Sequence, residues 1–351
     1  MSFKGVKVFA LEGSDQLAAE VCQELSRRLP LDLQPENGLT LSRPEVVRFS
    51  NENIQVRIDD VRGRFVVVIH TQTSPVNERL FELFALLDAI NNSGIGDLLL
   101  VFPYMPYARS DRKNQPRISV MGNALPRILQ RAFSVRRALL MDPHDTHTKH
   151  YFYPSADEIT TVHLFSDYIL NCLIPQKPGE QFLITFPDAS ASRRNEKLID
   201  ITGLPFDYID KMRPRNDEDP LIKKGIFAGF VKDKICLIID DEILSGNTAI
   251  KDAIMLKEYG AKRIKFMAPH GILNDQKMLA ADLIKKLNDS PIDQFILTDS
   301  IPCRDKVEGH PKFKILSIAG LLAEAINRTI QNRSLTELHE QDNVGLYRPV
   351  Y

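Results

Sequence analysis

The chain has 351 residues, of which 43% are hydrophobic and 26% charged, as is typical of a globular protein large enough for two domains. Its net charge is −1 at pH 7, which excludes the basic surplus of a nucleic-acid-binding protein, and no apolar run is long enough to span a membrane. Its four cysteines are scattered without a CxxC pair, and the first residues lack the organisation of a signal peptide. We therefore expect a cytoplasmic protein that binds small anions, with no nucleic acid and no membrane as partners.

Apolar runs alternate with amphipathic helical patterns in the first half of the chain. The apolar runs predict strands at residues 7–10, 65–70, 98–103 and 137–141. The helical patterns predict helices at residues 15–28, 77–91 and 120–132. Strands that alternate with helices over such lengths indicate parallel strands joined by crossover helices.

The same alternation begins again near residue 154. Further strands are predicted at residues 182–186, 206–209, 234–239 and 264–268. Further helices are predicted at residues 193–202, 250–259 and 318–330. The pattern predicts an α/β fold with two successive halves, each a mainly parallel sheet covered on both faces, followed by a tail at residues 331–351.

The segment KICLIIDDEILSGNT, residues 234–248, carries the clearest chemical signal. Its apolar run ends in two adjacent carboxylates, Asp240 and Asp241, and a short loop containing Gly246 leads into a helical pattern. Open α/β sheets bind ligands where strands end, paired carboxylates suit ribose hydroxyls and Mg²⁺, and helix N-termini suit phosphate. An ordinary strand–turn–helix unit, capped by Ser245 or Asn247, is the simpler alternative, but it leaves the repulsion between the carboxylates uncompensated.

Other segments place this motif in a family. In chain order they are VRFSNENIQVRIDDVRG, SPVNERLFEL, PYMPYARSDRK, MDPHDTH, FPDASASRR, IDKMRP and AKRIKFMAPHGIL. Together with DDEILSGNT they resemble, over nearly the whole chain, a divergent member of the ribose-phosphate pyrophosphokinase (phosphoribosyl-pyrophosphate synthetase) family. The resemblance implies two tandem phosphoribosyltransferase-like domains, at residues 1–153 and 154–317, with the helix at 318–330 packed back on the first.

The resemblance also implies a reaction. Members of the family use Mg²⁺ to transfer the β,γ-diphosphoryl group of ATP to the anomeric hydroxyl of ribose 5-phosphate, and they form homo-oligomers. The implied catalytic residues are Lys211, Arg213 and His144, and the implied metal ligands are His144 and Asp188. The implied ATP-binding residues are Phe49, Asn51, Asn53, Arg109 and Asp111. The implied sugar-phosphate-binding residues are Asp240, Asp241, Ser245, Gly246, Asn247 and Thr248.

The chain departs from the family pattern near both substrates. Leu244 stands where the family has an acidic or small polar residue, and Asn247 stands where it has Gly. Ser190 and Ala191 replace two glycines, and the two asparagines of the ATP-binding set replace an Asp and a Glu. We still expect the protein to bind ATP, but these changes leave the identity of the sugar acceptor open.

Several alternatives therefore remain. The same chemistry on a larger acceptor such as ADP-ribose would account for a remodelled 5-phosphate loop. A non-catalytic regulatory paralogue is a second alternative, and a phosphoribosyltransferase that consumes the activated sugar is a third. Separately, His144, His147 and His150 are spaced by three and offer a metal site along one helix face.

Overall fold

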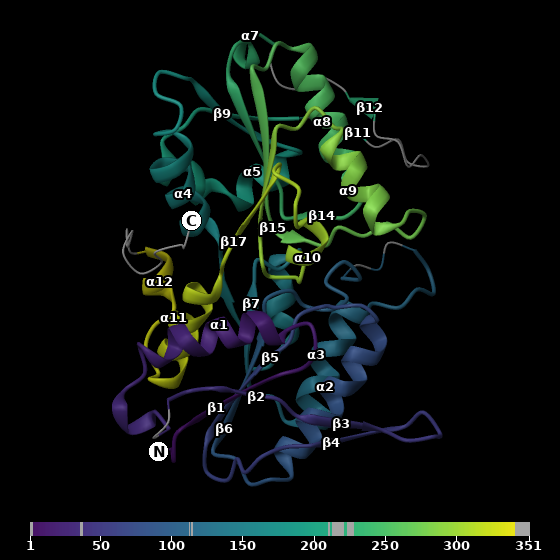
Figure 1. The fold of residues 1–351 in the computed structure, drawn as a ribbon, viewed down its shortest axis with the longest axis vertical. Coiled ribbons are helices and arrows are strands. Elements are labelled where there is room, and N and C mark those ends of the chain that lie inside the picture. Colours follow the sequence, from purple (N-terminus) through teal and green to yellow (C-terminus); the bar gives the residue numbers. More distant parts are fainter. Residues whose placement is uncertain are drawn as a thin grey trace. The chain divides into compact units, whose positions relative to one another are not determined.

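The computed structural model describes residues 3–35, 38–111, 113, 115–209, 211–212, 221–222 and 228–340. The chain divides into two compact units, whose elements are labelled in Figure 1. Of the described residues, unit 1 contains those up to Thr160, Ser300–Pro302 and residues 318–340, and unit 2 contains those within Thr161–Asp299 and Cys303–Ser317. The first boundary falls later than the expected one after residue 153, because a strand at residues 157–159 still pairs with the sheet of unit 1.

Unit 1 is built on a parallel sheet. Within the described residues its strands are β1 (Val6–Ala10), β2 (Leu41–Ser42), β5 (Phe65–Ile69), β6 (Asp97–Phe102), β7 (Arg137–Met141) and β8 (Asp157–Ile159). They lie in the order β2-β1-β5-β6-β7-β8, and each neighbouring pair is parallel. A separate antiparallel hairpin joins β3 (Glu45–Arg48) to β4 (Ile54–Arg57).

Helices cover the sheet of unit 1. In the described part of the chain they are α1 (Asp15–Ser26), α2 (Val76–Asn91), α3 (Met121–Phe133), α11 (Ala319–Ile330) and α12 (Thr336–Glu340), with short 3-10 helices η1 (Leu31–Leu33) and η2 (Thr146–Tyr151). The helix expected at residues 318–330 is α11, and it packs against α1, whereas α2 packs against α3. In Figure 1, α1 and α11 lie on one side of the sheet, and α2 and α3 lie on the other. This is expected because the chain runs from β1 to β2 in one direction along the sheet and from β5 to β8 in the other, and right-handed crossovers then fall on opposite faces.

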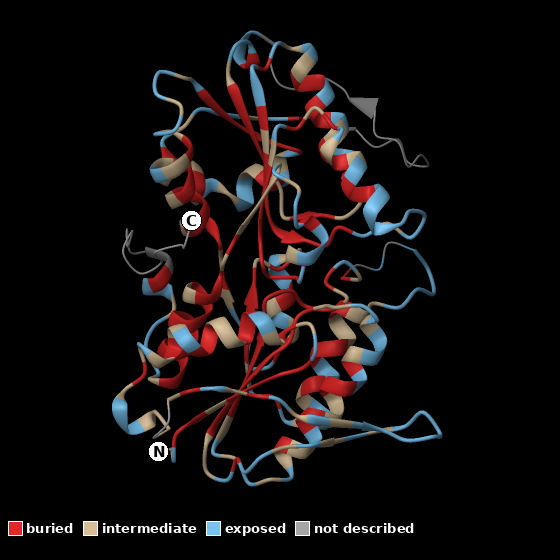
Figure 2. Cartoon of the chain, in the orientation of Figure 1, coloured by how far each residue is buried: buried red, intermediate tan, exposed pale blue. Residues whose placement is uncertain are grey.

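Burial on both faces explains why the strands of unit 1 form. Every residue of β5 is buried, and the central strands of the sheet are coloured as buried in Figure 2. Val66 and Val68 belong to the core cluster that includes Leu83 and Leu87 of α2, so Val67 points to the opposite face. A run of adjacent apolar residues is therefore required at this position, and alternation with polar residues would not suffice.

Unit 2 repeats the plan. Within the described residues its main sheet contains β9 (Phe182–Phe186), β10 (Phe206–Tyr208), β13 (Ile235–Ile239), β14 (Glu242–Ile243), β15 (Arg263–Gly271), β16 (Gln294–Thr298) and β17 (Phe313–Leu316). The order is β10-β9-β13-β15-β16-β17, β14 pairs with β15, and all these pairs are parallel. A small antiparallel pair joins β11 (Lys211–Met212) to β12 (Leu221–Ile222).

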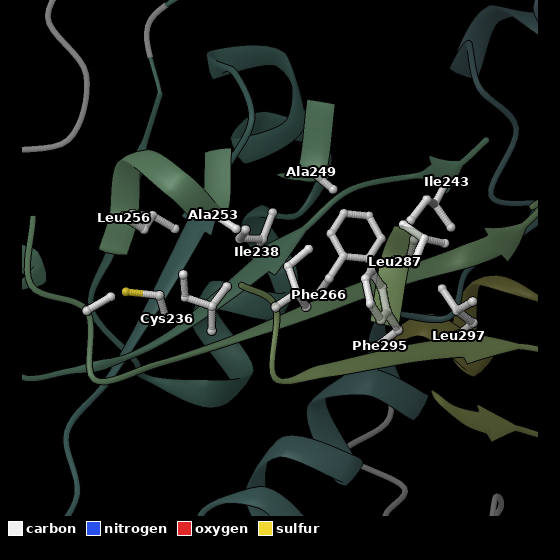
Figure 3. Packing of buried hydrophobic residues seen from close by; sticks show 14 of the residues in the cluster. Cys236, Ile238, Ile243, Ala249, Ala253, Leu256, Phe266, Leu287, Phe295 and Leu297 are labelled. Carbon is white, nitrogen blue, oxygen red and sulfur yellow. The ribbon is translucent and has the colours of Figure 1, made fainter. Parts of the chain in front are cut away.

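Helices also surround the second sheet. Those described are α4 (Val162–Tyr168), which continues as the π-helix η3 (Ile169–Leu173), α5 (Ala189–Arg194), α6 (Glu196–Thr202), α7 (Ala228–Val231), α8 (Asn247–Glu258), α9 (Ala280–Asn288) and α10 (Arg304–Val307). Figure 3 shows Ile238, Phe266 and Phe295 of the sheet packed with Leu256 of α8 and Leu287 of α9. This core fixes both helices relative to the ends of the strands.

The structure confirms the predicted α/β class with mainly parallel sheets. It corrects the helix predicted at residues 193–202, which is divided into α5 and α6 at Asn195, whose Nδ2 donates to the Ala191 carbonyl oxygen at 2.9 Å. The elements α9, β16 and β17 were not among those predicted. No helix in the described part of the chain combines the length and the apolar character needed to cross a membrane.

Candidate functional site

The predicted sugar-phosphate residues lie where the strand order of unit 2 reverses. The chain passes from β9 to β10 on one side and then returns to β13 on the other side of β9. Asp188 comes shortly after β9, and Asp240 comes directly after β13. Because parallel strands end at one edge of a sheet, both carboxylates belong to the edge where open α/β sheets bind ligands.

Backbone hydrogen bonds hold Asp240 and Asp241. The Asp240 N–H donates to the Met267 carbonyl oxygen at 3.0 Å, and the Asp241 N–H donates to Asp240 Oδ1 at 2.9 Å. The His270 N–H donates to the Asp241 carbonyl oxygen at 3.2 Å. Burial raises the pKa of Asp240 well above its usual value, and the charge of Asp241 raises it further. A cation or a hydroxyl donor at this position would stabilise the charged carboxylates.

Gly246 shapes the loop that follows β14. Its φ of +70° lies in the left-handed region, and a Cβ atom there would be 2.4 Å from Leu287 Cδ2. The next residue, Asn247, begins α8, whose first turn has no acidic residue and whose N-terminus has no side-chain cap. Asn247 and Thr248 are exposed. The first N–H groups of a helix have no partner within it, so this turn suits a phosphate.

One cation at this loop was missed by sequence reasoning. Lys286 Nζ, on α9, donates to the Ser245 carbonyl oxygen at 3.0 Å and to Asn247 Oδ1 at 2.5 Å. The preceding residue, Lys285, is also a lysine, so residue type does not distinguish the two. One signal in the sequence does distinguish them. Lys286 directly precedes Leu287, which belongs to the buried face of α9, so Lys286 lies at the edge of that face.

Asp188 caps a short helix. Its Oδ1 accepts a hydrogen bond from the Ala191 N–H at 2.8 Å at the start of α5, and its side chain is exposed. Within the described residues this is the one hydrogen bond of its side chain, so the second carboxylate oxygen remains for a ligand. Ala191 is fully buried and Ser190 is exposed, so only the serine can contact a ligand at this edge.

Arg109, Asp111 and His144 occupy the corresponding edge of unit 1. The arginine and aspartate follow β6 and the histidine follows β7, which is the next strand in the sheet. The Gly122 N–H at the start of α3 donates to the Ser110 carbonyl oxygen at 2.8 Å and so fixes the loop after β6. Arg109 is exposed and His144 is half-buried, whereas Asp111 is buried within the loop.

The alternative metal site at three spaced histidines is not formed. His147 Nδ1 lies 2.8 Å from Asp145 Oδ1, and His150 Nδ1 lies 3.2 Å from Ser155 Oγ. Both histidines lie on η2, which begins after His144, so the three rings do not share one helix face. Among the residues that the structure describes, no three His, Cys, Asp or Glu side chains are grouped to hold a metal ion.

Phe49 lies at the tip of the hairpin formed by β3 and β4, which projects from unit 1 in Figure 1. The Phe49 N–H donates to the Asn53 carbonyl oxygen at 2.9 Å and closes the loop, while the ring remains 47% exposed. The Asn53 N–H donates to Asn51 Oδ1 at 3.3 Å. The hairpin therefore presents an aromatic face, and the amide oxygen of Asn51 is already engaged in its own turn.

Each unit brings together part of the predicted set. Unit 2 places Asp188 at the same edge as the segment from Asp240 to Thr248, and unit 1 places Arg109 at the same edge as His144. Of the predicted catalytic pair, Lys211 lies in β11, and Arg213 lies outside the described residues.

The chain is similar to proteins of one family along most of its length. Residues 6–132 match the model of the N-terminal domain of ribose phosphate pyrophosphokinase, and residues 212–340 match that of the phosphoribosyl synthetase-associated domain. Ribose-phosphate pyrophosphokinase 1 of Listeria innocua serovar 6a is 30% identical over 336 residues, covering 95% of this chain and 97% of its own. Ribose-phosphate pyrophosphokinase of Campylobacter jejuni subsp. jejuni serotype O:2 is 29% identical over 336 residues, covering 95% and 99%. The crystal structure of phosphoribosylpyrophosphate synthetase from Mycobacterium smegmatis matches with a TM-score of 0.79 and 26% identity, covering 94% of this chain and all of that one.

Two parallel α/β units, the second with adjacent carboxylates and a glycine loop at its switch point, define an enzyme of the phosphoribosyltransferase-like fold. The chain belongs to the ribose-phosphate pyrophosphokinase family, and it is therefore a diphosphotransferase. The predicted family, fold class and enzyme class are confirmed.

Proposed function

We propose that this protein transfers the β,γ-diphosphoryl group of ATP to the anomeric hydroxyl of ribose 5-phosphate with Mg²⁺, releasing phosphoribosyl pyrophosphate and AMP. One observation carries the proposal: Asp240, Asp241 and the Gly246 loop share the switch point of unit 2 in a chain of this family. The carboxylates accept hydrogen bonds from ribose hydroxyls, and the loop and the start of α8 donate N–H groups to the 5-phosphate.

The reaction balances as a displacement at the β-phosphorus. The anomeric oxygen forms a bond to that phosphorus, the bond to the α,β-bridging oxygen breaks, and AMP leaves while the hydroxyl proton passes to solvent. Phosphoryl transfer depends on positioning and charge neutralisation more than on covalent catalysis. We assign Lys211 and Arg213 to the charge of the transferring group, and Arg109, Asp111, Phe49, Asn51 and Asn53 to ATP.

The donor set of unit 2 fits Mg²⁺. This cation prefers oxygen ligands and is usually held by one or two carboxylates, substrate phosphates and water. Asp188 offers an uncommitted carboxylate oxygen, and burial together with the charge of Asp241 raises the pKa of Asp240, so a bound cation would favour its charged form. When bound, the cation would neutralise charge on the ATP phosphates. We assign His144 to the ATP phosphates and their Mg²⁺, as a hydrogen-bond partner of phosphate or a ligand of the metal.

The direct test is the release of AMP from ATP and Mg²⁺, with ribose 5-phosphate, ADP-ribose or no acceptor. We expect AMP with ribose 5-phosphate, and we expect Asp241→Asn to weaken the use of both acceptor and Mg²⁺. Asp289→Asn, at an exposed aspartate of unit 2, is the matched control. A clear preference for ADP-ribose would replace the proposed acceptor, and no AMP with either would refute the proposed reaction.

A second test addresses the proposed role of Lys211. If it stabilises the transition state, Lys211→Ala lowers kcat by about 100-fold with a smaller change in the KM for ATP. Lys232→Ala, at an exposed lysine of the same unit, should leave both constants unchanged. An equal loss of nucleotide binding and turnover in Lys211→Ala would contradict this role.

We also propose that the chain assembles into a homo-oligomer, on the basis of its family resemblance. Sedimentation velocity of the purified full chain tests this proposal, and a single species with the mass of one chain, 39.9 kDa, would contradict it.

A further inference from the structure

Two consecutive residues of α9 support the sugar-phosphate loop of unit 2. Leu287 packs so closely against Gly246 that a Cβ atom on the glycine would lie 2.4 Å from Leu287 Cδ2. Lys286 Nζ donates to the Ser245 carbonyl oxygen at 3.0 Å and to Asn247 Oδ1 at 2.5 Å. Both contacts fall on the residues that lead into α8, so α9 determines where the first N–H groups of α8 are placed.

The support is itself rigid. Leu283, Ile284 and Leu287 of α9 are buried in the core of unit 2, and Figure 3 shows Leu287 within that core. At the end of the helix, Asn288 Nδ2 lies 2.6 Å from His310 Nδ1. Close-packed cores resist small displacements, so the Lys286 ammonium reaches the loop from a fixed base.

Lys286 also adds charge where the proposed ligand carries a dianion. An ammonium group has three N–H donors, and within the described residues two of them are used, by Ser245 and Asn247. Both acceptors are uncharged, so the loop keeps the full positive charge of the lysine. The first turn of α8 has no acidic residue to offset it. The third donor is therefore left for a phosphate oxygen.

We propose that Lys286 is a positioning and specificity residue for the 5-phosphate of the sugar acceptor. It orders the loop through Ser245 and Asn247 and donates its remaining N–H group to the phosphate. This inference rests on the proposed sugar-phosphate site of unit 2. It follows that affinity for the acceptor depends on Lys286, while affinity for ATP does not.

Steady-state kinetics of three full-length variants test this role. Lys286→Met should raise the KM for ribose 5-phosphate about 10-fold or more, because a charge-assisted hydrogen bond is lost, and should leave the KM for ATP within twofold of wild type. Lys286→Arg should restore most of the acceptor affinity. Lys285→Met removes the adjacent exposed lysine and should behave as wild type. An unchanged KM for ribose 5-phosphate in Lys286→Met, or an equal rise in both KM values, would overturn the proposal.

A binding measurement separates this inference from the proposed reaction. Hydrogen exchange at the amides of residues 246–249 is compared with and without inorganic phosphate. Phosphate should slow exchange in wild type and Lys285→Met and have no effect in Lys286→Met. No protection in wild type, or equal protection in all three proteins, would overturn the inference. Protection that depends on Lys286 in a protein that releases no AMP would leave the inference standing and refute the proposed reaction.

Discussion

Replacing Gly246 by alanine tests the close contact between α9 and the loop proposed to bind the sugar phosphate. Gly246 has φ +70°, and an L-residue in that conformation costs about 1 kcal/mol. The new Cβ would also lie 2.4 Å from Leu287 Cδ2, and moving a core side chain to relieve such a clash costs about 1–3 kcal/mol. We therefore expect Gly246→Ala to lower the free energy of unfolding by about 2–4 kcal/mol.

Urea unfolding followed by far-UV circular dichroism measures this effect, since the chain contains no tryptophan. Gly203→Ala is the matched control, because Gly203 has φ +61° in the same unit but no atom within 4 Å of the added Cβ, so it should cost only about 1 kcal/mol. In a Leu287→Ala background the clashing atom is absent, so Gly246→Ala should also cost about 1 kcal/mol there. Equal costs at the two glycines, or the same cost of Gly246→Ala in both backgrounds, would refute the clash.

Three further predictions follow from single residues. Burial lowers the pKa of His70 from 6.5 to about 4, so its neutral form is favoured in the folded state, and the stability it contributes above pH 6.5 is lost as the pH falls toward 4. The loss of stability caused by His70→Asn should therefore be about 2 kcal/mol smaller at pH 5 than at pH 7 in urea unfolding, and an equal loss at both pH values would contradict this reasoning. Phe49→Ala should raise the KM for ATP about 10-fold through lost stacking while leaving the melting temperature unchanged, because the ring is exposed; an unchanged KM would remove Phe49 from the ATP site. Glu324→Ala should cost about 1–3 kcal/mol in thermal unfolding because it removes the carboxylate 2.8 Å from the buried Arg328, which keeps Glu337 at 3.2 Å, and a loss below 1 kcal/mol would show that the pair behaves as a surface ion pair.

Much of the fold could be located from the sequence because the parallel strands are buried on both faces. The apolar runs predicted at residues 137–141 and 182–186 coincide with β7 and β9, and the run ending before Asp240 is β13. Once the strand ends are known, the edge that carries Asp188 and Asp240 follows from parallel pairing alone. The candidate site of unit 2 was therefore predictable in outline from its residues.

The sequence patterns failed at two places, a break in a helix and an exposed hairpin. The helical periodicity of residues 193–202 did not reveal the break at Asn195, where a side-chain hydrogen bond to Ala191 competes with continuation of the helix. The hairpin that exposes Phe49 showed no apolar alternation strong enough to predict it, because its strands are largely exposed.

The sequence by itself determined the α/β class, most strand ends and the residue types at the carboxyl edge of unit 2, since these depend on burial and periodicity that any short segment reveals. Only the tertiary structure decided which segment supports the Gly246 loop. Lys286 and Lys285 are the same residue type on one helix, yet the packing of Leu287 under Gly246 turns only Lys286 toward Ser245 and Asn247. Which lysine contacts the loop depends on how α9 packs on the sheet. A periodic pattern along one segment predicts that one face of a helix is buried, but it does not predict which residues of other segments cover that face.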